Sequence, residues 1–297
     1  MGPTASGKTA LSLELCTRMP AEIISVDSAQ VYLGMDIGTA KPDLATRASV
    51  PHHLIDILDP ADAYSAARFA ADATRLIAEI IGRGRVPLLV GGTMLYFRAL
   101  QAGLHALPSA DAAVRSRLEC EAKNLGSAGL HARLRELDAV SAARLHPNDL
   151  QRIQRALEII ECTGMTPTEF YAQPLTGGIA GTVIKIGMQT PQRTELHSRI
   201  ERRLLQMMRD GFVEEVEALY RRGDLCPEMP SIRAVGYRQL WPFVAGQCSR
   251  DEAVQRCIAA TRQFAKRQLT WLRSETGVHW LDSATNDLVG QAMKLLK

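Results

Sequence analysis

The chain has 297 residues, of which 46% are hydrophobic and 23% charged, and its formal net charge at neutral pH is +3. This length allows one large domain or two ordinary ones, and the apolar fraction is high enough for a buried core. No apolar run approaches the roughly 18 residues of a membrane span, and no charged and then apolar leader opens the chain, so we expect a cytoplasmic globular protein. The small net charge neither indicates nor excludes a nucleic-acid partner.

The cysteine spacing argues against the usual cysteine sites. No two of the six cysteines form a C-x-x-C pair, as a zinc site or a redox motif would require, and their scattered positions do not resemble a disulfide framework. We therefore predict buried free thiols at Cys16, Cys120, Cys162, Cys226, Cys248 and Cys257.

The first residues carry a phosphate-binding motif. Residues 2–9 read GPTASGKT and fit G-x-x-x-x-G-K-[ST] at every defined position, and a helix-like run follows at 10–15. In such a loop backbone N–H groups converge on phosphate oxygens, Lys8 adds a positive charge, and the Thr9 hydroxyl can contact a Mg²⁺ bound to the same phosphates. The alternative is an ordinary Gly/Ser loop that caps a helix. The motif predicts a phosphate compound without identifying it.

A P-loop normally follows a buried hydrophobic strand, but only Met1 precedes this one. Because a sheet without its central strand loses its best-buried ladder, we expect the natural chain to begin further upstream. Mass spectrometry of the native N-terminus tests this expectation.

The segments that follow alternate between predicted strands and helices. Residues 23–26 form a short β-rich apolar run, and Asp27 comes directly after it, so we expect its carboxylate at the phosphate site. The polar, glycine-rich stretch 28–42 is typical of a loop that lines a site. Further predicted elements are a possible strand at 52–56, an amphipathic helix at 65–81, and a buried strand at 86–90 that stops at Gly91-Gly92-Thr93. This alternation predicts an α/β fold with a parallel sheet and helices on both faces.

The pattern changes at about Pro108. Residues 109–166 contain helical stretches rich in Ala, Leu, Arg and Glu and no convincing strand, and one helix covers 149–158. The sheet is expected to resume at 182–188, with a late strand at 278–281. We therefore predict a P-loop catalytic core at 1–108 and 167–297 and an inserted helical subdomain at 109–166.

A basic stretch lies near the C-terminus. Between Ala253 and Ser274 there is no acidic residue, and the five basic ones are Arg256, Arg262, Lys266, Arg267 and Arg273. Phe264 and Trp271 are interleaved with them, which suits phosphate contacts from the cations and stacking from the aromatic rings. The alternative is a solvated helix face with both aromatic side chains in the core.

Several separated segments together resemble one family, the bacterial tRNA dimethylallyltransferases, also called tRNA isopentenyltransferases. The segments DSAQVY at 27–32, MDIGTAKP at 35–42 and KRQLTWLR at 266–273 are specific in this order, whereas many unrelated enzymes share a P-loop. Further matches are residues 2–9, GGTMLY at 91–96, QRIQR at 151–155 and IRAVGY at 232–237. The chain departs from the family at the missing first strand, and it lacks the zinc finger of the eukaryotic relatives.

The resemblance implies transfer of the dimethylallyl group of dimethylallyl diphosphate to N6 of adenine 37, immediately 3′ of the anticodon, with release of diphosphate. The P-loop then holds a leaving diphosphate, whose charge is neutralised by backbone amides, Lys8 and a Mg²⁺ near Thr9. Adenine N6 is a poor nucleophile, so a base must take its proton, and we favour Asp27 because a carboxylate is ionised at neutral pH. Asp27 also fits a Walker-B acid that holds Mg²⁺, so that role remains open.

The remaining site residues are implied by the same resemblance. Thr93 is expected near the reacting nucleotide, with a helix N-cap as its alternative role, and Thr9 is the expected metal contact. Diphosphate binding is implied for Gly2, Thr4, Ala5, Ser6, Gly7, Lys8, Thr9, Arg199 and Arg202, the two arginines being otherwise plain surface charge. Contacts with the tRNA anticodon stem-loop are implied for Asp27, Ser28, Ala29, Gln30, Thr93, Arg115, Gln151, Arg152, Ile153, Gln154, Arg155, Ile232, Arg233, Ala234, Val235, Gly236, Tyr237, Lys266, Arg267, Gln268, Trp271 and Arg273.

Two other functions remain open at this point. An adenylate isopentenyltransferase acting on free AMP or ADP shares the P-loop chemistry but has little use for residues 151–155 or the basic stretch. A P-loop nucleotide kinase or ATPase fits the bare motif and predicts ATP turnover. For the tRNA enzyme we expect Mg²⁺ as the cofactor, tRNA and dimethylallyl diphosphate as partners, no membrane, and a monomer.

Overall fold

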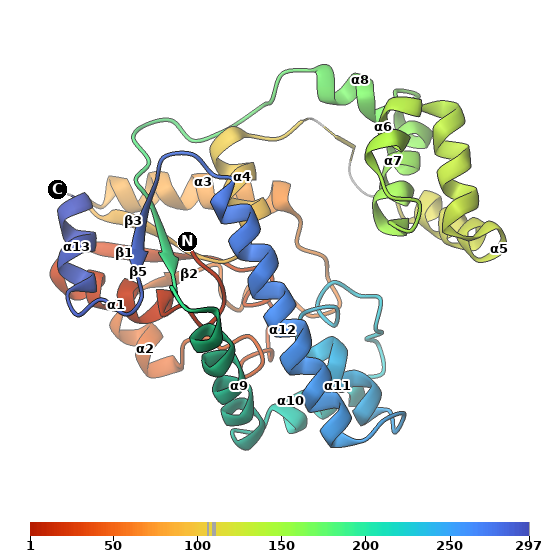
Figure 1. The fold of residues 1–297 in the computed structure, drawn as a ribbon. Helices are drawn as coiled ribbons and strands as arrows, with labels where there is room; N and C mark the ends of the chain where they lie inside the picture. The colour runs from red at the N-terminus through yellow and green to blue at the C-terminus, as the bar shows by residue number, and fades with distance from the viewer. Residues whose placement is uncertain (106, 109–110, 297) are drawn as a thin grey trace. The chain divides into compact units, whose positions relative to one another are not determined.

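The structure is a computed structural model in which residues 1–105, 107–108 and 111–296 are described. The chain forms two compact units (Figure 1), which we call the core unit, Met1–Leu100 with Ala180–Lys297, and the helical unit, Gln101–Ile179. The domain boundaries expected from the sequence stay a prediction, and residue 109, where the helical subdomain was expected to begin, lies outside the described residues.

A three-stranded parallel sheet carries the first half of the core unit. Its strands are β1 (Ala21–Val26), β2 (His52–His53) and β3 (Val86–Gly91), in the order β2-β1-β3. The register of β1 and β3 runs from Ala21 opposite Val86 to Val26 opposite Gly91, so both strands end at the same edge of the sheet. Every residue of β1 is buried, as its continuous apolar run predicts for a parallel strand between two neighbours.

The second pair of strands, β4 (Lys185–Gln189) and β5 (Val278–Asp282), is also parallel and forms a separate two-stranded sheet among the described residues. Met1 lies beside β4, because the Met188 N–H donates to the Met1 carbonyl at 2.8 Å and the Met1 amine donates to the Ile186 carbonyl at 2.8 Å. The predicted α/β class with parallel strands is thereby confirmed.

Helices cover these sheets in a chain order that follows the predicted alternation. The helix α1 (Lys8–Arg18) buries Leu11 and Leu15 against β4, β5 and α13 (Leu288–Leu295). Figure 1 shows α1 beside α13. The amphipathic helix α3 (Ala66–Gly82) starts where Ser65 accepts a hydrogen bond from the Arg68 N–H, and it packs on β1 and β3. The short α2 (Leu44–Ser49) and α4 (Met94–Ala102) complete this half.

Four helices from the last third of the chain complete the core unit. These are α9 (Arg193–Arg209), α10 (Phe212–Arg221), α11 (Tyr237–Val244) and α12 (Arg250–Arg273). The helices α9 and α12 share a small apolar cluster of Leu196, Ile200 and Ala265, against which Ala5 of the phosphate-binding motif packs. This contact connects the first residues of the chain to its last long helix.

The helical unit consists of α5 (Ala112–Leu137), α6 (Ala139–Arg144), α7 (Leu150–Thr163) and α8 (Pro167–Ala172). The helix α5 is interrupted at Gly126, whose φ of 69° and ψ of 176° are not helical. Leucine side chains of α5 pack against α7, where Ile153 and Leu157 are fully buried. The hydrophobic spacing of α7 therefore serves to close this small core.

The structure differs from the sequence-based prediction at three places. The strand expected at 52–56 ends at His53, because Leu54 and Asp56 have φ values of 61° and 53° and turn the chain away. The strand expected at 182–188 begins only at Lys185. Buried thiols were expected throughout, but the structure exposes Cys120 and Cys162 and fully buries Cys257 alone among the six free cysteines, all of which it describes. Among the described residues, no helix is long and apolar enough to cross a membrane.

Candidate functional site

A chamber of about 390 Å³ opens inside the core unit at the edge where β1 and β3 end. It is lined by the phosphate-binding motif, the strand ends, the loop 38–42, the segment 233–237 and side chains of α9, α10 and α12. Segments separated by more than 200 residues in the chain therefore meet around one space. A chamber of this size with polar groups at one end is a typical small-molecule site.

The phosphate-binding motif forms one end of the chamber. Thr4, Ala5, Lys8 and Thr9 line it, whereas Gly2 and Ser6 are buried behind them and Gly7 is exposed outside it. The motif leads directly into α1, so the helix N-terminus and its N–H groups lie at this end. The Lys8 ammonium donates a hydrogen bond to the Pro3 carbonyl at 2.6 Å, which folds the side chain back over the loop.

Two cations are brought together beside the motif. Burial and, to a lesser extent, the nearby positive charge of Arg203 lower the pKa of Lys8 to about 8, while Asp27 acts in the opposite direction. Burial likewise lowers the pKa of Arg203, again opposed by Asp27. Lys8 and Arg203 repel each other and have lost part of their hydration. A bound polyanion would relieve this repulsion.

The arginines of α9 lie in different places relative to the chamber. Arg203 lines the chamber, but neither Arg199 nor Arg202 does. The Arg199 side chain bonds to Glu195 and donates to the Ser283 hydroxyl at 3.2 Å, and Arg202 is exposed. Helical periodicity is the signal that could have found Arg203. Ile200 and Leu204 are core residues that also line the chamber. Arg203 follows Ile200 by three residues, so it lies on the same face of α9.

Asp27 lies at the tip of β1 and lines the chamber. Its Oδ1 atom accepts hydrogen bonds from the N–H groups of Ala29 at 2.9 Å and Gln30 at 3.4 Å. These bonds fix the orientation of the carboxylate in a local turn of the type that aspartate favours.

Thr93 reaches the same edge from β3. Its N–H donates to the Val26 carbonyl at 3.1 Å, and its hydroxyl accepts from the Ser28 N–H at 3.1 Å. The Thr93 carbonyl also accepts from the Phe97 N–H at 3.4 Å at the start of α4. Thr93 therefore stands at a helix start and in the chamber wall, which makes its two predicted roles compatible.

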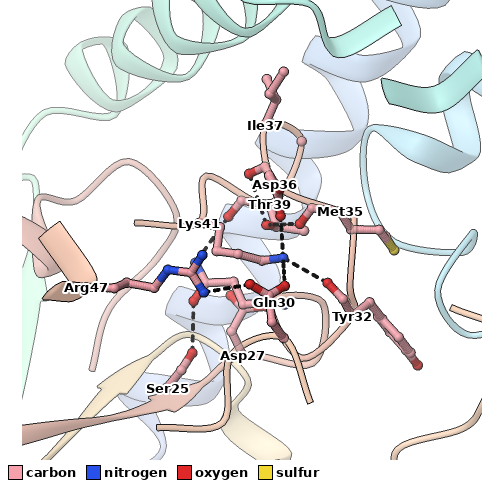
Figure 2. Close-up of polar contacts among 12 residues, drawn as sticks. Ser25, Asp27, Gln30, Tyr32, Met35, Asp36, Ile37, Thr39, Lys41 and Arg47 are labelled. Atoms are coloured by element: carbon pink, nitrogen blue, oxygen red, sulfur yellow. Dashed lines mark hydrogen bonds and ion pairs between the residues drawn. The ribbon is translucent and has the colours of Figure 1, made fainter. Parts of the chain in front are cut away.

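The loop 36–41 forms a further part of the wall and is fixed by side chains of the sheet edge (Figure 2). The Gln30 amide accepts a hydrogen bond from the Ser25 hydroxyl at 2.9 Å and donates to the carbonyls of Thr39 and Ala40, each at 3.3 Å. Gln30 was predicted to contact tRNA; the structure shows its amide bound to the loop.

Gln268 of α12, for which a tRNA contact was also predicted, has its amide bound inside the protein. Its side chain is buried, with Oε1 accepting from the Thr4 N–H at 2.8 Å and Nε2 donating to the Gly92 carbonyl at 2.9 Å. A Cβ at Gly92 would lie 2.1 Å from Nε2, so only glycine allows this approach. Gln268 thus links the phosphate-binding motif to the end of β3.

The basic stretch is divided between the chamber and the surface. Phe264 and the exposed Arg267 line the chamber, whereas the exposed Lys266, Trp271 and Arg273 do not. The alternative in which both aromatic side chains lie in the core is therefore wrong for both. Two of the cations pair with acidic residues outside the stretch, Arg262 with Glu201 at 2.8 Å and Arg256 with Glu252 at 2.5 Å.

The segment 232–237 contributes both wall and core. Arg233, Ala234, Val235 and Gly236 line the chamber. Ile232 is fully buried elsewhere, and Tyr237 reaches the chamber from a fully buried position, so neither side chain offers an exposed surface for RNA. The tRNA contacts expected for these two residues stay a prediction.

The cations of the helical unit that were expected to contact tRNA have internal partners. Arg115 donates to Glu158 at 2.8 Å and Arg155 donates to it at 2.6 Å. Arg152 is 73% exposed and paired with the helix-capping Asp149, and the exposed Gln151 lies beside it. Ile153 is fully buried in the unit's core, and the partly buried Gln154 donates to the Leu118 carbonyl at 3.5 Å. The tRNA contacts expected for these residues stay a prediction.

The donor groups at the chamber limit the kind of metal site that the protein can form. Among the described residues, no three His, Cys, Asp or Glu side chains lie close enough together to hold an ion by themselves. The Thr9 hydroxyl is exposed and lines the chamber next to the cations. This arrangement fits Mg²⁺, which usually keeps several waters and is held by one or two protein groups together with substrate phosphates.

Comparison with known proteins gave one family. A family model described as IPP transferase matches residues 30–275. A solved structure of a full-length tRNA isopentenylpyrophosphate transferase from Bacillus halodurans is 40% identical, with a TM-score of 0.69 over 99% of this chain and 92% of that protein.

Two further solved structures extend the similarity. A tRNA delta(2)-isopentenylpyrophosphate transferase from Staphylococcus epidermidis is 34% identical, with a TM-score of 0.69 over 100% of this chain and 97% of that protein. A eukaryotic dimethylallyltransferase acting on tRNA is 26% identical, with a TM-score of 0.80 over 98% of this chain and 76% of that protein. The similarity therefore covers both units.

Proposed function

The chain belongs to the IPP transferase family and is a tRNA-modifying prenyltransferase, and we propose that its chamber joins dimethylallyl diphosphate to N6 of adenine 37, the base 3′ of the anticodon. One observation carries the proposal: a phosphate-binding motif with two buried cations, Lys8 and Arg203, shares a single chamber with the carboxylate of Asp27. The chamber thus offers cations that can bind the leaving diphosphate and a carboxylate that can accept a proton.

The diphosphate is proposed to bind at the motif end of the chamber. The N–H groups at the start of α1 and the side chains of Lys8 and Arg203 supply donors and positive charge there. When the allylic C1–O bond breaks, its electron pair leaves with the diphosphate, and these groups stabilise the growing negative charge. Arg203 takes the place that the sequence had assigned to Arg199 and Arg202.

Mg²⁺ is part of the proposal as the cofactor. Thr9 is the residue that would hold it, together with the diphosphate oxygens. When bound, the ion supplies additional neutralisation of the leaving group.

The acceptor side of the reaction is proposed to use Asp27. As the bond between adenine N6 and C1 of the dimethylallyl group forms, a proton must leave N6, and the Asp27 carboxylate is the chamber base that can take it. Its backbone hydrogen bonds hold the carboxylate in one orientation, which a general base requires. Thr93, bound to Ser28 across the strand ends, forms the adjoining wall.

The tRNA is proposed to contact exposed polar residues. Gln151 and Arg152 of the helical unit and Ser28, Lys266 and Arg273 of the core unit have exposed side chains suited to phosphate or base contacts. Because adenine 37 must leave its stack to reach the chamber, Phe264, Arg267 and Arg233 of the wall are further candidates for the flipped base.

The function is tested with dimethylallyl diphosphate labelled in its prenyl group, incubated with this chain, Mg²⁺ and either tRNA, AMP or ATP. We expect label in tRNA alone, and nuclease digestion should recover it on adenine 37. Label in AMP would support the adenylate enzyme, and phosphate release from ATP without prenyl transfer would support a kinase or ATPase. A tRNA with guanine at position 37 is the matched control and should remain unlabelled.

A further inference from the structure

The carboxylate of Glu215 on α10 binds the backbone of a loop that lies 177 or more residues earlier in the chain. Its Oε2 atom accepts hydrogen bonds from the N–H groups of Asp36 at 2.8 Å and Ile37 at 2.7 Å. Its Oε1 atom accepts from the Gly38 N–H at 3.0 Å and from the Tyr237 hydroxyl at 2.5 Å. Consecutive amides that converge on one anion are a strong, charge-assisted arrangement.

The other end of the same loop is fixed by Lys41 (Figure 2). The Lys41 ammonium donates to the Tyr32 carbonyl at 2.8 Å and to the carboxylates of Asp36 and Asp56, both at 2.5 Å. Its side chain is only 1% exposed, whereas that of Asp56 is 23% and that of Asp36 59% exposed. The loop 36–41 is therefore held at both ends by charged side chains, of which Lys41 is buried.

Close packing leaves the loop one arrangement against α10 and α11. A Cβ at Gly38 would lie 2.1 Å from a ring atom of Phe212 and 2.6 Å from one of Tyr237, so glycine lets the backbone rest on both rings. The two rings meet edge to face with their centroids 5.0 Å apart. Burial and the adjacent negative charge of Glu215 raise the pKa of Tyr237, so its hydroxyl stays protonated and donates.

The loop connects Glu215 to the reacting end of the chamber. Gly38, Thr39 and Ala40 line the chamber, and the carbonyls of Thr39 and Ala40 hold the Gln30 amide. The backbone N–H of Gln30 in turn donates to Asp27 Oδ1. A shift of the loop would therefore change both the chamber wall and the support of the Asp27 carboxylate.

We propose that Glu215 is a positioning residue for prenyl transfer, which sets the backbone of the loop 36–41 so that the chamber wall beside Asp27 fits the prenyl diphosphate. This inference rests on the proposed function. Glu215 acts through the loop, and the diphosphate end of the chamber, built from the phosphate-binding motif, does not depend on it. The prenyl part of the substrate, and not its diphosphate, should sense a change at Glu215.

The variant Glu215→Gln tests the inference, because it replaces one carboxylate oxygen by an NH₂ group, which is a donor and would face the backbone N–H donors of the loop. Its matched control is Glu217→Gln on the same helix, where the Glu217 side chain is 44% exposed and pairs with Arg221. Steady-state transfer into tRNA, the affinity for inorganic diphosphate by calorimetry, and Tm are measured for each variant and for the unaltered chain.

For Glu215→Gln we expect kcat/KM to fall roughly 10- to 100-fold, with a higher KM for dimethylallyl diphosphate and an affinity for inorganic diphosphate within about twofold of the unaltered chain. Glu217→Gln should behave like the unaltered chain. If the loss appears only as a smaller active fraction with KM unchanged, or if diphosphate binding falls in parallel, Glu215 is merely structural and the inference is wrong.

Tyr237→Phe provides a second test that keeps the ring packing and removes only one donor to Glu215. We expect a roughly three- to tenfold rise in KM for dimethylallyl diphosphate, again with inorganic diphosphate binding kept. An unchanged KM in both variants would overturn the inference. Lack of prenyl transfer by the unaltered chain would instead contradict the proposed function.

Discussion

Two sets of cationic side chains, one in each unit, have opposite surroundings. In the helical unit, Arg115 and Arg155 share the buried carboxylate of Glu158, and Arg117 and Arg133 share that of Glu161. In the core unit, Lys8 and Arg203 lie in the chamber wall and make no salt bridge with any carboxylate among the described residues. The arginines of the helical unit join helices to one another, whereas Lys8 and Arg203 face the chamber.

This difference explains why the lowered pKa of Glu158 favours its charged form, whereas the lowered pKa values of Lys8 and Arg203 favour their neutral forms. Burial by itself raises the pKa of Glu158, but hydrogen bonds from Arg115 and Arg155 outweigh it and lower the pKa, so the ionised cluster stabilises the helical unit. For Lys8 and Arg203, burial lowers the pKa and Asp27 only partly compensates. The chamber therefore holds unneutralised positive charge, and a phosphate anion is the ligand that relieves it.

The largest expected effect tests which chamber group carries out the chemistry. Asp27→Asn keeps the oxygen that accepts from Ala29 and Gln30 but removes the base. Turnover should fall roughly 10²- to 10⁴-fold while inorganic diphosphate binds as before. Rapid-quench transfer assays and calorimetry measure the two quantities, with the exposed Asp62→Asn as the control. A loss of diphosphate affinity that disappears when Mg²⁺ is withheld would assign Asp27 the metal-holding role instead.

The next effect sharpens the contrast between a chamber arginine and its surface neighbour. Arg203→Gln should weaken binding of inorganic diphosphate roughly 10- to 100-fold, because it removes a charge-assisted donor from a buried site. The matched control Arg202→Gln, one residue earlier and exposed, should leave the affinity unchanged. Equal effects of the two substitutions would contradict the assignment of Arg203.

The lowered pKa of Lys8 predicts a pH dependence for the same ligand. Below its pKa of about 8 Lys8 is a cation and attracts diphosphate, and above it the charge is lost, so affinity should fall by up to about tenfold per pH unit as pH rises. Calorimetry between pH 7 and pH 10 follows the change, and Lys8→Met should remove it. An affinity that declines equally in Lys8→Met would show that a group other than Lys8 causes the decline.

The smallest expected effect concerns the paired cations of the helical unit. Glu158→Gln should lower the free energy of unfolding of that unit by about 1 kcal/mol, since two arginines lose a buried acceptor. Because the pKa of Glu158 is lowered from 4.5, its contribution is present above that pH and is lost as pH falls, so the variant should approach the unaltered chain in acid. Glu119→Gln on the exposed side of α5 is the control, and thermal unfolding with a probe in this unit is the measurement.

Local patterns were enough to predict most elements. The buried strand at 23–26, the helix at 65–81 and the strand at 86–90 all appear within one or two residues of their expected bounds, because hydrophobic periodicity and the Ser65 cap act over short distances. The strand expected at 52–56 failed because backbone turns at Leu54 and Asp56 depend on the partners of that loop, including Lys41 bound to Asp56.

The sequence by itself determined the phosphate-binding motif, the aspartate at a strand tip and the family, because each depends on residue types at short, fixed spacings. Only the tertiary structure decided which arginine of α9 faces the chamber, that Gln268 and Gln30 hold the site together, and that Glu215 fixes a loop of the opposite wall. The physical reason is that a side chain's role depends on what surrounds it after folding. Burial and the charge of neighbours far away in the chain make one arginine a cross-link and another a ligand for phosphate.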